Sequence, residues 1–141
     1  MGYTNDPRVI AREDHMTAVN PALEVDFLGR CAAESLGSEY LSSSGGQPDF
    51  ARGALLAEHG QSFIVLHSTT ADESVSRMVA QLHPGEAVTT FRNVVDHVVT
   101  EYGVAELRGS SIRERTRKLI ATAHPRFRDD LHRAAREIGH L

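Results

Sequence analysis

The chain has 141 residues, enough for one compact domain with a core of its own. Its 40% hydrophobic and 24% charged residues are ordinary for a soluble globular protein and argue against a disordered chain. The formal net charge of -4 argues against nucleic acid as a partner, and no apolar run approaches the ~18 residues of a membrane span. Because the N-terminal segment "MGYTNDPRVIARED" has no apolar region for export, the expected compartment is the cytoplasm.

The first predicted element is a strand in "ALEVDFLGR". Hydrophobic residues alternate there with the acids Glu24 and Asp26, which is the period-two pattern of a half-buried strand, and Gly29 ends it. The two acids share one face of this strand, and we expect that face to be in water. Cys31 has no second cysteine to pair with, so we expect a small apolar residue in the core or near the surface.

A glycine-containing loop is predicted next, at Ser42 to Gly46, followed by a helix. Pro48 suits the first helical turn, where its missing N–H costs nothing, and Asp49 favours the positive end of the helix dipole. Apolar residues then recur at helical spacing until Gly60, where we expect the helix to have ended.

Three β-rich runs follow the helix. "SFIVLHSTT" is a continuous apolar run, typical of a strand that is buried on both faces and delivers a loop at its carboxyl end. "GEAVTTF" and "VVDHVVTEYG" are separated by too few residues for a helix, so both are expected to be extended.

The end of the chain is predicted to be helical. Ser111 and Glu114 form an S-x-x-E capping box before "IRERTRKLI", whose basic residues alternate with an acid as on a solvated helix face. A second helix has Pro125 near its start and Gly139 near its end. The order of strands and helices predicts an α/β fold with a mixed sheet and flanking helices.

The loop before the first long helix is the main chemical candidate. A pair of glycines at a helix N-terminus leaves backbone N–H groups free for a phosphate, a carboxylate or an oxyanion, although such a pair is also typical of a simple tight turn. The tripeptide Gly45-Gly46-Gln47 also matches the GGQ of peptide release factors, but the short acidic chain argues against that function.

Other catalytic patterns are absent from the sequence. The eight histidines include no H-x-x-x-H pair and no HExxH motif, so no metal is expected. His97, inside an apolar strand, is expected to be hydrogen-bonded in the core rather than functional. No G-x-S-x-G elbow is present, and the serines at 42–44 are expected to support the loop through local hydrogen bonds.

Several motifs occur in a fixed order along the chain: "NPALEVDFLGR", "GGQPDFARGALLAEHG", "HSTTADESVSRMV", "VVDHVVTEYGVAELRG" and "SSIRERTRKLIATAHPRFRDDL". From about Tyr3 to Ile138 the chain resembles the C-terminal domain of the acetyl-CoA hydrolase/transferase family, which includes 4-hydroxybutyrate, butyrate and succinate CoA-transferases. The resemblance implies a single domain over residues 1–141, with the fold of a CoA-transferase C-terminal domain.

The resemblance also implies a function. Such enzymes transfer CoA from an acyl-CoA to a carboxylate through a covalent enzyme glutamate, with coenzyme A as substrate and no metal. Gly45 and Gly46 match the loop that contacts the thioester or its oxyanion. The expected contacts to substrate or CoA, at matching or neighbouring positions, are Ser44, Gln47, Asp49, Thr70 and Arg77.

The nucleophilic glutamate of the family lies in an earlier segment, so the N-terminal catalytic half is absent from this sequence. The implied partners are therefore an acyl-CoA, a carboxylate and an N-terminal CoA-transferase domain or subunit, with a homo-oligomer left open. Glu24 and Glu101 match other family positions and are not expected to be nucleophiles. The family proline after the buried strand is replaced by His67, and acids stand at Asp72 and Glu73, where they would repel a CoA phosphate. The alternative is a non-catalytic interaction module with the same fold.

Overall fold

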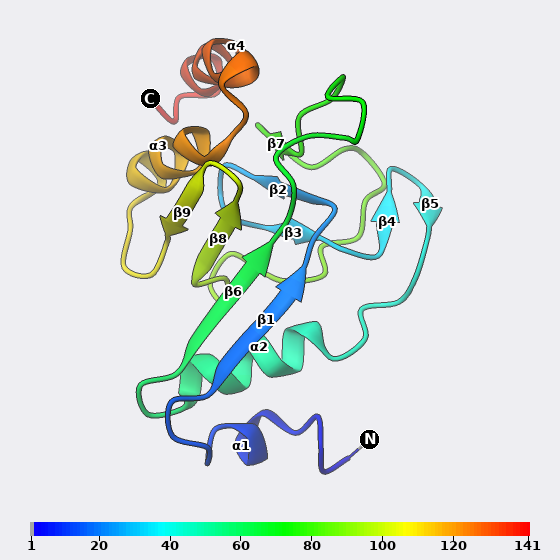
Figure 1. The fold of residues 1–141 in the computed structure, drawn as a ribbon, viewed down its shortest axis with the longest axis vertical. Helices are drawn as coiled ribbons and strands as arrows, with labels where there is room; N and C mark the ends of the chain where they lie inside the picture. Colours follow the sequence, from blue (N-terminus) through cyan, green and yellow to red (C-terminus); the bar gives the residue numbers. More distant parts are fainter. Residues whose placement is uncertain (1) are drawn as a thin grey trace.

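The computed structural model describes residues 2–141, which form an α/β fold with a mixed main sheet (Figure 1). The helices within this range are α1 (Pro7–Ile10), α2 (Gln47–Leu56), α3 (Ile112–Thr122) and α4 (Pro125–Glu137). The strands are β1 (Thr17–Pro21), β2 (Glu24–Asp26), β3 (Cys31–Ala32), β4 (Ser35–Leu36), β5 (Glu39–Tyr40), β6 (Gln61–Val65), β7 (Met78–Val79), β8 (His97–Thr100) and β9 (Gly103–Glu106). The predicted fold class is confirmed.

The main sheet has the order β1-β6-β8-β9. The central strand β6 pairs in parallel with both β1 and β8, while β9 returns antiparallel from β8 through a tight turn. Parallel pairing brings the carboxyl ends of β1, β6 and β8 to the same edge, the upper edge in Figure 1. Loops that leave this edge are where open α/β sheets usually hold ligands.

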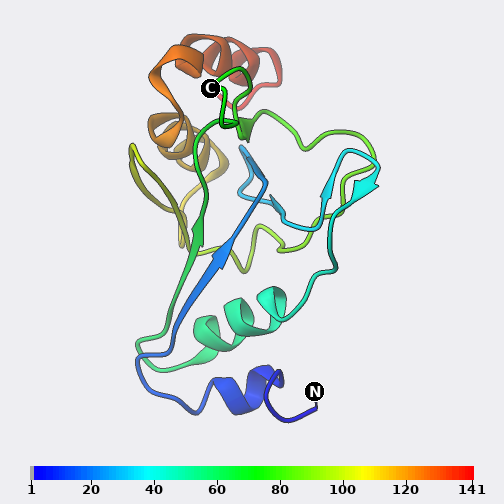
Figure 2. The same cartoon turned by 45° about the vertical axis from the view of Figure 1, so that its right-hand side comes forward.

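Two smaller sheets complete the β structure. In the three-stranded sheet, Val25 of β2 lies between Cys31 of β3 and Met78 of β7. The strands β4 and β5 form a short antiparallel hairpin, whose residue Leu36 pairs with Glu39. The three-stranded sheet joins β2 and β3, which precede α2 in the chain, to β7, which follows it, while the hairpin of β4 and β5 lies just before the loop that leads into α2 (Figure 2).

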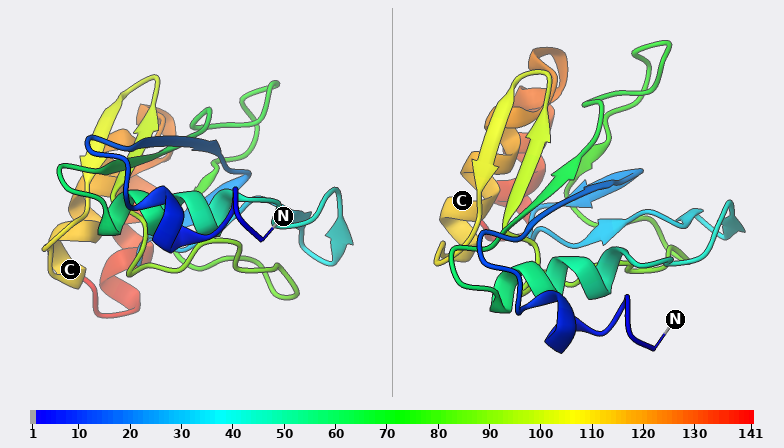
Figure 3. Two further views of the ribbon diagram at one scale, coloured as in Figure 1. Left: turned by 90° about the horizontal axis from the view of Figure 1, so that it is seen from below. Right: turned by 60° about the horizontal axis from the view of Figure 1, so that its bottom comes forward.

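The helices α1 and α2 lie together on one side of β1 and β6 (Figure 3). Their packing depends on Gly53, because a Cβ atom added at this position would lie 2.4 Å from Cγ2 of Ile10. Ile10 is 5% exposed, so the helices meet through the bare backbone of Gly53. This contact holds the N-terminal segment beneath the sheet.

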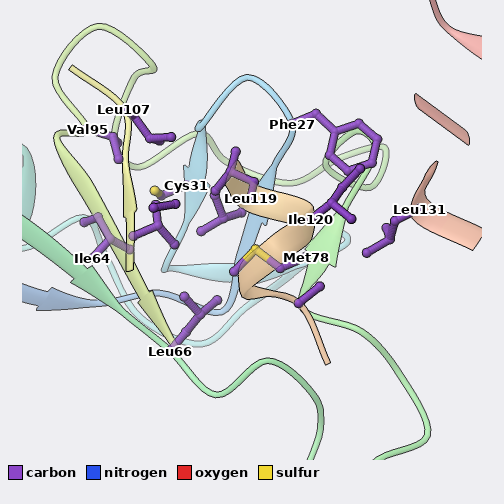
Figure 4. Close-up of a cluster of buried hydrophobic side chains, with 14 of the residues drawn as sticks. Phe27, Cys31, Ile64, Leu66, Met78, Val95, Leu107, Leu119, Ile120 and Leu131 are labelled. Carbon is purple, nitrogen blue, oxygen red and sulfur yellow. The ribbon is translucent and has the colours of Figure 1, made fainter. Parts of the chain in front are cut away.

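The hydrophobic core joins the same side of the main sheet to the C-terminal helices (Figure 4). Ile64 of β6 and Val98 of β8 pack in one cluster with Leu119 and Ile120 of α3, and all four are buried. Cys31 is fully buried in this cluster, as predicted, and burial raises the pKa of its thiol. No helix in residues 2–141 is long and apolar enough to cross a membrane.

The helix boundaries follow the sequence signals closely. The capping box before α3 is present, with Ser111 accepting from the N–H of Glu114 and the Glu114 carboxylate accepting from the N–H of Ser111. Pro125 begins α4 as predicted, and Gly139 follows its end with a φ of +75°. The helix α2 ends at Leu56, before Gly60.

The strand predictions were less accurate. The run at 85–91 forms no strand in the structure and is joined to Cys31 by one isolated bridge at Thr90. The run at 94–103 contains strand β8 only over four residues, because the chain turns back at Glu101 and Tyr102 into β9. The strand β1 was not predicted, since five residues that include Asn20 and Pro21 carry little β signal.

The burial predicted for two strands was also wrong. The acids of β2 lie in the protein interior rather than in water, with Glu24 5% exposed and Asp26 fully buried. Asp26 is stabilised there by the backbone N–H of Leu28 and by both the backbone and the guanidinium of Arg30. The strand β6 is buried on one face only, since Ser62 and Ile64 are buried while Val65 is 39% exposed.

Replacing Gly53 by alanine tests the contact between α1 and α2. Alanine would ordinarily stabilise a helix by about 1 kcal/mol relative to glycine. Here its Cβ would overlap Ile10, so we expect the free energy of unfolding to fall by about 1–3 kcal/mol. Urea unfolding measures the change, and Gly2→Ala is the control, since a Cβ there meets no atom within 4 Å. A more stable Gly53→Ala protein would contradict the packing.

Candidate functional site

The glycine loop leads directly into the N-terminus of α2. Gly45 has a φ of +56°, a conformation that residues with a Cβ seldom adopt, and a Cβ added there would meet no atom within 4 Å. Gly46 is the N-cap of α2 and makes no side-chain capping hydrogen bond. Ser44 is exposed, and the hydroxyl of Ser42 donates to the carbonyl of Ser43 rather than to the helix. The backbone is therefore open to an approaching group at Gly45, while Gly46 is half-buried beside the side chains of Asn5 and Phe50.

The first turn of α2 is held in place by Gln47. Its side-chain amide donates a buried hydrogen bond of 3.0 Å from Nε2 to Oγ1 of Thr90. Asp49 is half-buried in the same turn, where its charge suits the helix dipole. The hydrogen bond therefore attaches the first turn of α2, where the loop ends, to the segment that contains Thr90.

A cavity of about 600 Å³ opens at the carboxyl ends of β1 and β6. Both polar and apolar residues line it, and they come from three separate segments: Pro21, Ala22, Leu23, Val65, Leu66, His67, Thr69, Thr70, Ala71, Glu73, Arg77 and Glu101. Two of the residues expected to contact CoA, Thr70 and Arg77, are among them.

Arg77 braces the cavity wall with its guanidinium. Its Nη1 donates to the carbonyl of Leu23 at 2.9 Å, and its Nε donates to the carbonyl of Thr69 at 3.2 Å. These bonds hold the guanidinium at the cavity. They occupy two of its five N–H donors.

Thr70 begins the acidic loop at the cavity rim. Its hydroxyl donates to Asp72 at 2.6 Å, and this bond, with those from Ser74, lowers the pKa of Asp72 to about 2. The loop therefore carries a full negative charge at neutral pH, beside the cavity that Arg77 lines.

Glu101, which was not expected to be a nucleophile, is a cavity residue. Its carboxylate accepts from the backbone N–H of Ser68 at 3.0 Å and from the Ser68 hydroxyl. Partial burial raises the pKa of Glu101, but the bonds from Ser68, the bond from its own backbone N–H and the nearby His67 together leave the pKa below its ordinary value. The motif "VVTEYG" draws attention to this residue, but only the turn between β8 and β9 brings it to the end of β6.

The predicted site residues fall into two groups. Ser44, Gly45, Gly46, Gln47 and Asp49 lie at the start of α2, and none of them lines the cavity that contains Thr70 and Arg77. Figure 2 shows the start of α2 well below the segment 66–77.

His97 is only partly buried. Its ring stacks on Phe63 with ring centroids 4.6 Å apart, and its Nδ1 lies 3.2 Å from the carbonyl of Ser62.

A further group of titratable side chains lies on β2 and the turn at 83–86. Nδ1 of His83 lies 2.9 Å from the carboxylate of the buried Glu24, and Glu86 lies beside both. Burial raises the pKa of Glu24, although the bond from His83 opposes it, and that same bond raises the pKa of His83. The three side chains could offer ligand atoms to an ion, so the expected absence of a metal stays a prediction.

The fold is that of an α/β domain with a cavity at the carboxyl ends of parallel strands, which is where open α/β sheets usually hold ligands. Residues 1–135 match the acetyl-CoA hydrolase/transferase C-terminal domain, and the chain belongs to this family.

Several relatives of the chain are CoA-transferases. The chain is 46% identical over 139 residues to the succinyl-CoA:cyclohexane-1-carboxylate CoA transferase of Geobacter metallireducens, covering 99% of this chain and 32% of that protein. It is 48% identical over 129 residues to the 4-hydroxybutyrate coenzyme A transferase of Clostridium kluyveri, covering 92% of this chain and 30% of that protein. The crystal structure of RipA from Yersinia pestis superposes with a TM-score of 0.92 at 40% identity, over 99% of this chain and 31% of that one. The chain thus spans about a third of the length of these relatives.

The pair of His83 and Glu24 makes stability depend on pH. Both pKa values are raised in the folded state, so folding takes up protons, and the stabilisation is lost as the pH rises through them. We expect His83→Gln to cost about 0.5–1 kcal/mol at pH 6, below the ordinary histidine pKa of about 6.5, and less at pH 8. Urea unfolding at both pH values measures this, with His132→Gln as the control for loss of an imidazole. An equal loss at pH 6 and pH 8 would contradict the assignment.

Proposed function

We propose that this chain is the C-terminal part of an acyl-CoA:carboxylate CoA-transferase, and that its glycine loop stabilises the oxyanion formed at the thioester. The observation that carries the proposal is the uncapped start of α2 behind Gly45 and Gly46, in a chain of this family. Backbone N–H groups at such a helix end favour negative charge, both as donors and through the helix dipole.

The chemistry requires a nucleophile from outside this chain. A glutamate of the N-terminal CoA-transferase part attacks the thioester carbonyl, and the collapse of the tetrahedral oxyanion gives an acyl-glutamyl anhydride and CoA thiolate. The thiolate then attacks the glutamyl carbonyl, which releases the acyl carboxylate and leaves a glutamyl-CoA thioester. A second carboxylate reverses these steps and takes the CoA.

The glycine loop acts where charge develops in each of these steps. Each addition places a negative charge on a carbonyl oxygen, and an N–H donor already aimed at that oxygen contributes about 3–4 kcal/mol. Glycine suits this position because the thioester can approach the backbone without meeting a Cβ. Gln47 supports the function by fixing the first turn of α2 to Thr90.

The cavity at the carboxyl ends of β1 and β6 is proposed to hold another part of the acyl-CoA. Thr70 and Arg77 line it and offer polar donors, although Arg77 already donates to two carbonyls. The negative charge of Asp72 at the rim disfavours a phosphate there, so the cavity suits the uncharged pantetheine arm better. That charge also favours the second candidate function, a non-catalytic interaction module.

Binding to the isolated chain tests the loop. We expect calorimetry to detect the binding of coenzyme A and of acetyl-CoA. We expect Gly46→Asp to weaken acetyl-CoA binding at least tenfold, because the new carboxylate would bond to the free backbone N–H groups and repel the ligand. An added Cβ lies 2.9 Å from Nδ2 of Asn5 and 3.2 Å from the Phe50 ring, both side-chain atoms that can shift. Ser43→Asp is the control, since it adds the same charge to the same loop. Undiminished binding by Gly46→Asp would reject the loop assignment.

Thioester exchange tests the whole proposal. We expect the chain alone to transfer no CoA between acetyl-CoA and a carboxylate, since its nucleophile is missing. Transfer should appear when the N-terminal two thirds of the Clostridium kluyveri enzyme is co-expressed with it, as measured by exchange of labelled acetate into acetyl-CoA. A complex of the two parts that binds acetyl-CoA but transfers nothing would favour the interaction module.

A further inference from the structure

One face of the main sheet is open and largely apolar. We call it the outer face; its apolar residues, which share one side through the strand register, are Val19, Pro21, Phe63, Val65, Val99 and Val104, and the polar residues Thr17, Gln61, His97 and Glu106 lie on the same side. Val19 is 64% exposed and Val104 is 59% exposed. This is the face turned to the viewer in Figure 1, with α2 behind β1 and β6.

The opposite face of the same strands is fully used. Ala18, Ile64, Val98 and Ala105 alternate with the outer-face residues and are all buried. Ile64, Val98 and Ala105 belong to the core cluster that includes residues of α3, while α2 packs against β1 and β6. The helices thus cover one side of the sheet. Within residues 2–141, no helix covers the outer face.

An open face is unusual for strands that pair in parallel. Parallel sheets are covered on both faces, because the connections between their strands carry helices to both sides. The strands β1, β6 and β8 are parallel, and the run from Phe63 to Leu66 is apolar without interruption, which is the pattern of a strand buried on both faces. The sequence of β6 is therefore suited to a second layer that residues 2–141 do not supply.

The comparison with relatives indicates what that layer is. The chain matches a C-terminal domain and spans about a third of the CoA-transferases most similar to it, so those proteins carry some two thirds of their length outside this region. A contiguous apolar face on a sheet is a site for a protein partner. Phe63, on which His97 stacks, lies on this face, and helices are what usually cover the faces of a parallel sheet.

We propose that the outer face is the docking surface for a helical layer contributed by the N-terminal part of a CoA-transferase. This inference rests on the proposed function, because that function requires such a part. Docking there completes the two-sided cover of the parallel strands and fixes the N-terminal part relative to the edge where β1 and β6 end at the cavity.

The test is co-purification. This chain is co-expressed with the tagged N-terminal two thirds of the 4-hydroxybutyrate coenzyme A transferase from Clostridium kluyveri, and the amount recovered in complex is measured by native mass spectrometry. We expect a one-to-one complex, and we expect Val19→Lys with Val104→Lys to reduce it at least tenfold, because two ammonium groups would be buried without partners. Leu41→Lys with Leu56→Lys is the matched control; these leucines are 57% and 62% exposed and lie off the outer face, so the complex should persist. Circular dichroism and the urea midpoint of each isolated chain confirm that the substitutions leave its fold intact.

The other outcomes are decisive as well. A complex that survives the two valine substitutions, or no complex with the unchanged chain, would overturn the proposal. Dimers of this chain that the valine substitutions abolish, with no N-terminal part bound, would also overturn it and assign the face to a second copy. A complex that forms through this face but transfers no CoA would support the docking surface and count only against the proposed function.

Discussion

The parallel pairing of β6 with both β1 and β8 is the constraint on which the rest of this structure depends. It places residues that are far apart in the sequence, such as Pro21 and Val65, side by side at one edge of the sheet. The cavity forms there because the chain must leave every strand at this edge and return through loops. The same pairing imposes a second demand, since parallel strands require cover on both faces and α2 and α3 cover one.

The glycine loop is related to this constraint only through α2. The helix packs beneath β1 and β6, and its first turn is tied by Gln47 to Thr90, so the backbone at Gly46 has a fixed direction. A group that uses main-chain donors needs such rigidity, because an oxyanion is stabilised only when the donors are in place before the charge develops. A Cβ at Gly45 would be disfavoured by the φ of +56° there and would narrow the approach to the backbone.

The charges around the two candidate regions are arranged unevenly. Arg77 lies at the cavity with two of its donors occupied by carbonyls, while Asp72 at the rim is strongly acidic. The two interior acids of β2 are neutralised in different ways: Asp26 through Arg30 and backbone N–H groups, and Glu24 through His83. Asp26 is thus paired with a permanent cation, whereas the partner of Glu24 is one whose charge depends on pH.

Local sequence alone determined the elements whose signals lie within a few residues. The capping box of α3, Pro125 at the start of α4 and the glycine loop before α2 were all predicted, because caps and turns depend on neighbouring backbone groups. The motifs also determined the family, since their order along the chain needs no tertiary structure. The tertiary structure alone decided what depends on pairing between distant segments: that β1 is a strand, that Glu24 and Asp26 are buried, and that Glu101 reaches the cavity. It also separated Gly46 from Arg77, because distance in space is set by the register and crossing of whole elements, which no spacing along the chain encodes.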